Sequence, residues 1–230
     1  MDFDFSPFFK RYEALAAQAE AAFDKIREAY PDAVKCVREC SDCCHAIFDV
    51  TFIEAIYINH KFNQTYEGKA LEELLERANK ADRIVHRLKR DATKALESGT
   101  DENAILEKMA ESRVPCPLLN QKNLCDLYED RPITCRLYGV PTAIGGKGHT
   151  CGLSAFEPGQ AYPTVNLDAI QDRLFEISRD LVTALGSRHV RMGDMVVPLS
   201  MALITTYNED YLGILNKDEE PEAGDSGDSE

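Results

Sequence analysis

Eight cysteines carry the chemistry that this sequence could perform, and all of them lie between positions 36 and 151. They are Cys36, Cys40, Cys43, Cys44, Cys116, Cys125, Cys135 and Cys151. The first four lie within nine residues, and a gap of 71 residues separates them from the second four, which are spaced along a stretch rich in loop-forming residues. The spacing of Cys40 and Cys43 lets two thiolates reach one ion. The pattern predicts a metal site built from two separated segments, with four thiols from each.

The number of thiols bears on which metal is bound. One tetrahedral zinc ion takes four thiolates at about 2.3 Å and would leave four of the eight unused. Eight thiolates suit two four-coordinate sites, or one polynuclear cluster with spare ligands. We expect the neighbouring side chains of Cys43 and Cys44 to diverge and to face two different metal atoms. Iron-sulfur clusters present several irons to cysteine-dense runs and to a remote cysteine, and Cys116-Pro117 resembles the Cys-Pro ending of some cluster motifs. We therefore expect an iron-sulfur cluster, with zinc as the alternative metal and disulfides as the other use of these cysteines.

Two histidines and two tyrosines lie close to these cysteines. His45 follows Cys44 directly, and His149 lies two residues before Cys151. Either could replace a thiolate, but with eight thiols present we expect each to be a neighbour of the site. Tyr128 and Tyr138 are expected to pack over the site and exclude water from it.

Basic residues flank both groups of cysteines. Arg131 and Arg136 lie on either side of Cys135, and Lys35 and Arg38 lie within the first cluster. They could compensate the charge of the thiolates and donate hydrogen bonds to sulfur. The alternative is ordinary ion pairing in a chain with 40 acidic residues. The sequence leaves both open.

No catalytic residue can be singled out. The sequence has no recognisable nucleophile triad and no carboxylate pair that differs from the many other acidic residues. The glycine-rich segment 145–148 lacks the preceding strand and following helix of a phosphate-binding loop, so we expect a flexible turn there. No reaction and no small-molecule substrate can be assigned.

The charge of the chain excludes some partners. A formal net charge of −14 argues against nucleic acid or an anionic membrane as the main partner, because both attract basic surfaces. The segment 1–4 has neither the basic nor the apolar part of a secretory signal, and the longest apolar run, 195–204, is too short to span a bilayer. We therefore expect the protein to lie in the cytoplasm, where cysteines are kept reduced.

The remaining sequence predicts mainly helices. A first helix begins with Ser6 as its N-cap and Pro7 in its first turn, and ends near Pro31. A capping box at Thr51 and Glu54 predicts a second helix directly behind the first cysteines. Apolar residues at helical spacing predict helices over 68–97, 102–112 and, with Asn166 as its N-cap, from there to about 186. The segment 195–204 could be a helix from Pro198 or a strand.

These elements define the expected fold. No alternating run predicts a sheet, so we expect a mainly α fold in which an irregular, loop-rich cysteine site joins two segments. Residues 1–216 are expected to form one helical domain whose cysteine core spans 36–151. Residues 217–230 are expected to be a disordered acidic tail, since 218–230 hold seven carboxylates and no basic residue.

The cysteine segments resemble a known family, the YkgJ-like cysteine cluster proteins, described as a zinc- or iron-chelating domain. The resemblance covers about 36–151. It rests on Cys36-x-x-x-Cys40-x-x-Cys43-Cys44 with Thr51 and Glu54, then Cys116-Pro-Leu-Leu119, Cys125-Asp-Leu-Tyr128, Arg131-Pro132, Cys135-Arg-Leu-Tyr138-Gly139 and Cys151. The family spacing is Cys-x-x-Cys-x-x-Cys-Cys, and the first interval here is one residue longer.

The resemblance implies metal binding but no single reaction. We expect an iron-sulfur protein with a redox, sensing or accessory role for another enzyme. The alternative is a structural zinc module that mediates binding to a protein partner. Metal storage or delivery is a third hypothesis.

Overall fold

The computed structural model describes residues 3–214, apart from the side chain of Ala110. The acidic segment 217–230, for which the sequence predicts a disordered tail, lies outside the described residues. The fold is mainly α, as the sequence predicts. Its α-helices are α1 (Ser6–Ala29), α2 (Phe52–Thr65), α3 (Gly68–Glu97), α4 (Glu102–Glu111), α5 (Ile133–Leu137), α6 (Leu167–Ala184), α7 (Leu199–Ile204) and α8 (Glu209–Leu212). Two 3-10 turns are η1 (Cys43–His45) and η2 (Val190–Asp194).

Two small sheets form, one of which joins distant parts of the chain, so the expectation that no sheet forms is wrong in this respect. β1 (Asp49–Thr51) pairs antiparallel with β5 (Val196–Pro198), placing Val50 opposite Val197. β2 (Thr142–Ile144) pairs antiparallel with β3 (Lys147–His149) and parallel with β4 (Val165–Asn166). Strands of two or three residues are too short to show an alternating pattern. The segment 195–204 combines both expected states, since β5 leads directly into α7.

Local signals account for most helix boundaries. The capping box at Thr51 and Glu54 is present and opens α2, and the Asn166 side chain accepts a hydrogen bond from the Ala169 N–H at the start of α6. The start of α1 differs slightly, because Phe5 is the N-cap and Ser6 already lies in the helix. The backbone N–H of Ser6 instead donates to the Asp4 carboxylate.

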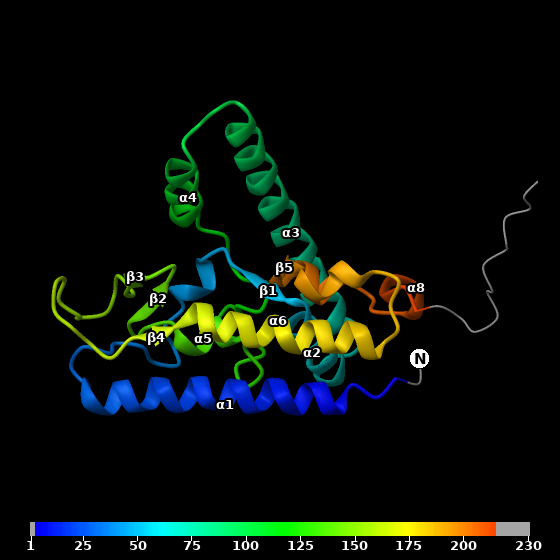
Figure 1. Ribbon diagram of the computed structural model, residues 1–230, viewed down its shortest axis with the longest axis horizontal. Coiled ribbons are helices and arrows are strands. Elements are labelled where there is room, and N and C mark those ends of the chain that lie inside the picture. Colours follow the sequence, from blue (N-terminus) through cyan, green and yellow to red (C-terminus); the bar gives the residue numbers. More distant parts are fainter. Residues whose placement is uncertain (1–2, 215–230) are drawn as a thin grey trace, which may run out of the picture.

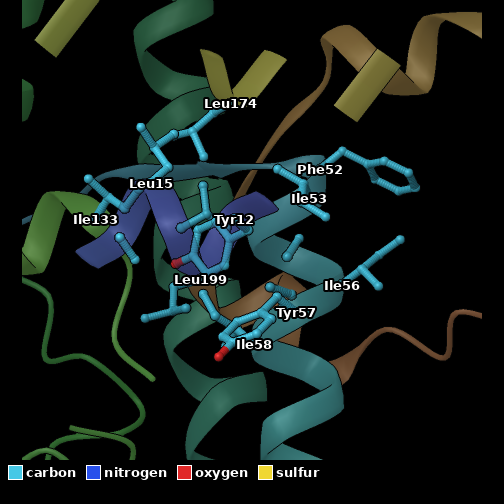
Figure 2. Packing of buried hydrophobic residues seen from close by; sticks show 14 of the residues in the cluster. Tyr12, Leu15, Phe52, Ile53, Ile56, Tyr57, Ile58, Ile133, Leu174 and Leu199 are labelled. Carbon is cyan, nitrogen blue, oxygen red and sulfur yellow. The ribbon is translucent and has the colours of Figure 1, made fainter. Parts of the chain in front are cut away.

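The hydrophobic core lies between α1, α2 and α6 (Figures 1 and 2). α1 and α6 run side by side, and α2 is buried along most of its first two turns. Aromatic residues join α1 to α2, since the ring of Tyr57 lies 4.6 Å from that of Tyr12 and 5.3 Å from that of Phe9. Each fully buried large apolar side chain contributes about 1.5–3 kcal/mol. This packing fixes α1 and α2, the two helices that flank the first cysteine cluster in the chain.

Helices α3 and α4 form a hairpin that projects from the rest of the molecule (Figure 1). α3 packs against α7 at its base, where Ser200 donates to Asp82 and Lys89 pairs with Asp49 at 2.6 Å. Beyond α4 the chain returns to the body through Val114, which is buried against Ala81 and Val85 of α3. The hairpin therefore separates the two cysteine segments in sequence while its base holds them together in space.

Within residues 3–214 we find no helix that combines the length and the apolar character needed to cross a bilayer.

Candidate metal centre

The fold brings the two cysteine segments together around one cavity. Seven thiols, those of all the cysteines except Cys151, line a cavity of about 250 Å³. Cys151 lines a smaller adjoining pocket together with Cys36, Cys40 and Cys43, so three cysteines are shared between the two spaces. All eight side chains are half-buried and none forms a disulfide.

Backbone hydrogen bonds join the two segments directly. The Cys116 N–H donates to the Cys44 carbonyl at 2.7 Å, and the Val114 N–H donates to the His45 carbonyl at 3.0 Å. Beside them Arg113 donates to the carbonyl and to the carboxylate of Asp42. The base of the α3–α4 hairpin thus sets the separation between Cys44 and Cys116.

A tight loop carries Cys125 to the cavity. Leu119 and Cys125 face each other in an isolated β-bridge, and the Asn120 side chain accepts hydrogen bonds from two backbone N–H groups inside the loop. Asp126 ties the loop to the helical body, because Arg77 of α3 donates to its carboxylate at 2.7 Å. Cys125 is therefore positioned from α3 as well as from its own loop.

Glu54 positions the helix that carries Cys135. One carboxylate oxygen of Glu54 accepts from the Ile133 N–H at the start of α5, and the other accepts from the N–H and the hydroxyl of Thr51. Glu54 is only 4% exposed, and this burial raises the pKa of its carboxyl group. The capping box that begins α2 is thus also the anchor for α5.

Two nearly buried arginines supply positive charge to the cavity wall. The side chains of Arg131 and Arg136 are 13% and 12% exposed, and both pair with Glu20 of α1, at 2.7 and 2.6 Å. Burial by itself would raise the pKa of Glu20. The hydrogen bond from Arg136 and the charge of Arg131 outweigh burial, so the pKa of Glu20 is lowered. Two cations share one carboxylate, so one positive charge remains to compensate thiolates. The ion pairing that the sequence leaves open for these arginines is therefore present, and their compensation of thiolate charge stays a prediction.

The outer wall of the cavity stacks cations on an aromatic ring. The guanidinium carbon of Arg131 lies 4.1 Å from the ring centroid of Tyr128, and that of Arg38 lies 4.8 Å from it. Arg38 is mostly exposed and also lies near Glu129. Tyr128 therefore holds two basic side chains beside the thiols, in addition to the packing that the sequence predicts for it.

Several thiols of the cavity have raised pKa values, so these thiols are protonated at neutral pH when no metal ion is present. Burial raises the pKa of Cys36 to about 11 and that of Cys116 to about 12, and it raises the pKa values of Cys125 and Cys135 as well. A metal ion that binds here must displace protons from these groups.

Cys43 and Cys44 share the wall of one cavity, and the expectation that they face two different metal atoms stays a prediction. Both line the same cavity, and a hydrogen bond with the Cys44 thiol, followed by burial, raises the pKa of Cys43 far above its usual range. The two residues begin the 3-10 turn η1, in which the Cys43 carbonyl accepts from the Ala46 N–H. The turn holds the two thiols close together, while Cys43 alone of the two also lines the adjoining pocket.

The donor set fits zinc or iron better than harder cations, because soft thiols predominate in the cavity. Within residues 3–214, however, no three His, Cys, Asp or Glu side chains already converge on one point as metal ligands. The thiols surround a space instead. Side-chain rotations would bring them onto a metal, and any such centre would form together with local ordering of the cysteine loops.

The other residues that the sequence singled out do not line the main cavity. His45 Nδ1 lies 3.0 Å from the Ser41 carbonyl, and His149 is exposed on β3. Lys35 and Tyr138 line the pocket that holds Cys151. The glycine-rich segment is the turn between β2 and β3, where Gly145 and Gly146 adopt positive φ.

Two residues of α1, Glu20 and Tyr12, contribute to the site although the sequence did not predict this. Glu20 neutralises part of the arginine charge, and the hydroxyl of Tyr12 lies near Cys135 and Glu54. The sequence places Tyr12 only in an apolar helical stripe and gives no signal at all for Glu20. An acidic residue next to such a stripe has no distinguishing pattern.

Comparison with known proteins finds one family. The family model described as "CxxCxxCC: Putative zinc- or iron-chelating domain" matches residues 35–152, more than half of the 230 residues. The match begins just before Cys36 and ends just after Cys151. No curated protein and no solved structure matches the chain.

Proposed function

The chain belongs to this CxxCxxCC family of zinc- or iron-chelating domains, and on that premise we propose that it is an iron-sulfur protein with a redox, sensing or accessory role for another enzyme. One observation carries the proposal: seven thiols from two segments line a single cavity whose wall also holds two nearly buried arginines. One zinc ion would use four of these thiols. A polynuclear cluster uses such a cavity more fully.

The residues that would hold the cluster are drawn from the seven that line the cavity, with Cys151 available from the adjoining pocket. Such a cluster supplies one-electron transfer when bound. The protein contributes the charge of Arg131 and Arg136, which favours electron-rich states of a thiolate-bound group. It also contributes the partial burial of the thiols, which limits the access of water.

A structural zinc module is the second candidate, and the hydrogen bond between Cys116 and Cys44 favours it. A zinc ion held by thiols from both segments would clamp the base of the α3–α4 hairpin and present the hairpin to a protein partner. In this case the metal contributes folding free energy and no electron transfer.

We place the protein in the cytoplasm as part of the same proposal. Thiol ligands need a compartment in which cysteines stay reduced, and none of the eight cysteines forms a disulfide in the structure.

Metal analysis tests the proposal. The full chain is purified without oxygen, and its iron, zinc and acid-labile sulfide are measured per chain together with an absorption spectrum. We expect iron and sulfide together with broad absorption near about 400 nm. Zinc without sulfide and a featureless visible spectrum would replace the iron-sulfur proposal by the zinc module.

Cysteine substitutions test which thiols hold the metal. We expect Cys43→Ala and Cys44→Ala each to release metal and to lower the melting temperature, because binding and folding are coupled. His149→Ala is the matched control, since His149 is exposed and lies outside the cavity. Full metal content in both cysteine variants would exclude this cavity as the metal site.

A further inference from the structure

The hydroxyl group of Tyr12 is buried without a hydrogen-bond partner. Tyr12 is 1% exposed, and its Oη is the buried side-chain polar atom that lacks a partner among the residues that the structure describes. Buried hydroxyl groups are normally hydrogen-bonded, because leaving one unpaired forfeits its interaction with water. The Tyr12 hydroxyl is therefore a buried donor that is available to an acceptor beside it.

A neighbouring tyrosine shows the usual arrangement. The ring of Tyr57 on α2 lies 4.6 Å from the ring of Tyr12, in the same core. The Tyr57 hydroxyl donates towards Glu13 Oε1 at 3.0 Å and Asp130 Oδ1 at 3.1 Å. Of two tyrosines packed against each other, one is fully partnered and the other is not.

The Tyr12 hydroxyl faces the helix that carries Cys135. Figure 2 shows it on the side of the ring where Ile133, the first residue of α5, lies. The ionisable groups that influence its pKa include Glu54, Arg136 and Cys135. The region between α1 and α5 is therefore polar, although apolar side chains surround it.

Most polar groups of this region are already engaged. Glu54 accepts three hydrogen bonds from Thr51 and Ile133, and Arg136 donates to Glu20 and to the carbonyls of Glu129 and Arg131. The Cys135 sulfur has no donor among the described residues. It is a poor acceptor as a thiol and becomes a strong one when a metal displaces its proton.

We propose that the Tyr12 hydroxyl donates a hydrogen bond to the Cys135 sulfur once a metal has converted that thiol to a bound thiolate. The inference rests on the proposed metal-binding function and deepens it. Tyr12 is then a positioning residue, which acts on the metal through Cys135. Hydrogen bonds to ligand sulfurs hold the ligand in place and stabilise its negative charge. Tyr12 lies outside the family match at 35–152, so this donor comes from a helix that the family model does not include.

Two phenylalanine substitutions in the full-length chain test the inference. Tyr12→Phe and Tyr57→Phe each remove one hydroxyl from the same aromatic cluster and keep the ring. Zinc alone is the probe, and its affinity is measured by competition with a chromophoric chelator. The stability of the metal-free, reduced chain is measured by denaturant unfolding.

The two variants should behave in opposite ways. We expect Tyr12→Phe to weaken zinc binding about tenfold, the lower end of the range for residues that orient metal ligands. Its metal-free form should be no less stable than wild type, because no hydrogen bond is lost. Tyr57→Phe should unfold at lower denaturant concentration when metal-free and bind zinc with the affinity of wild type. In iron-loaded protein, Tyr12→Phe should also make the reduction potential more negative, since the lost donor stabilises the reduced state.

Each contrary result has a distinct meaning. If Tyr12→Phe binds zinc as tightly as wild type, the inference is wrong and the metal-binding proposal stands. If Tyr12→Phe destabilises the metal-free chain as much as the metal-loaded chain, the hydroxyl interacts with Glu54 whether or not metal is bound. The inference is again wrong in that case. If wild type and Tyr57→Phe bind neither zinc nor iron, the proposed function itself is wrong.

Discussion

Gly139 lies directly against the side chain of Cys36. A Cβ atom placed on Gly139 would lie 2.7 Å from the Cys36 Cβ and 3.3 Å from its sulfur. Gly139 also has a φ of +110°, which residues with a side chain rarely adopt. The close approach joins the end of the Cys135 segment to the beginning of the first cluster, so the backbone at position 139 sets where the Cys36 thiol can lie.

Gly139→Ala should therefore displace Cys36 as well as strain the backbone. The contact is to the Cβ of Cys36, which cannot move without its backbone. We expect the free energy of unfolding to fall by about 2–4 kcal/mol, with strain contributing about 1–3 kcal/mol, and metal content to fall as well. Denaturant unfolding and metal analysis of the purified variant measure both effects.

Gly146→Ala is the matched control for this substitution. Gly146 also has positive φ, at +74°, but no atom lies within 4 Å of the position that a Cβ would take. It should lose some stability through strain alone and keep its metal. Equal metal content in the two variants would show that the contact with Cys36 has no part in the site.

Glu54→Ala should release α5 from α2. The substitution removes the acceptor for the Ile133 N–H and for both Thr51 donors, all of them buried. We expect a loss of about 2–4 kcal/mol in the free energy of unfolding, because buried donors left unpaired cost about 1–3 kcal/mol each and part of this is recovered by relaxation. Hydrogen exchange should show faster exchange at 133–137, and metal affinity should fall because Cys135 lies on that helix.

An exposed glutamate on α3 provides the comparison. Glu76→Ala removes a carboxylate of the same type from a helix surface and should change stability by less than about 0.5 kcal/mol. If Glu54→Ala behaves like Glu76→Ala, Glu54 does not anchor α5.

The sequence predicts elements well where the signal is local. α3 has the predicted bounds, since a glycine marks the start of the helix and Ser98-Gly99 follows the end of its apolar stripe. The capping box at Thr51 and Glu54 lies within four consecutive residues and was found for the same reason. The grouping of the cysteines was also predictable, because a dense run of thiols is unusual in itself.

Elements held by distant contacts could not be predicted. α5 has five residues and depends on Glu54, which lies 79 positions before Ile133 in the chain. β1 and β5 have three residues each and pair across most of the chain. The functions of Glu20 and Tyr12 depend on how α1 docks on α5, and no spacing rule encodes that docking.

Glu20→Gln should lower the stability of the metal-free chain more than that of the metal-loaded chain. The substitution leaves Arg131 and Arg136, both nearly buried, without their shared carboxylate. We expect the metal-free chain to lose about 1–3 kcal/mol in the free energy of unfolding, less than for a fully buried pair because Glu20 is partly exposed. The metal-loaded chain should lose less, since a negatively charged thiolate centre pairs with the freed cations. The increase in stability on metal loading should thus be larger in Glu20→Gln than in wild type, and an equal or smaller increase would contradict charge compensation by these arginines.

The number of protons released on metal binding counts the thiolate ligands. Burial raises the pKa of Cys36 to about 11 and that of Cys116 to about 12, so these thiols are protonated well above neutral pH. Each thiolate formed must then release one proton, and zinc affinity should rise about tenfold per pH unit for each thiolate ligand. For ordinary cysteines this rise would level off near their pKa of about 8.5, whereas here it should continue beyond that value.

Titration calorimetry in buffers with different heats of ionisation measures the proton count directly. We expect about four protons per zinc ion at pH 7, because a structural zinc site takes four ligands. If two ions bind, about eight protons per chain would show that all eight cysteines take part. A count well below four per ion would mean that side chains other than these thiols complete the coordination, which would contradict an all-cysteine centre.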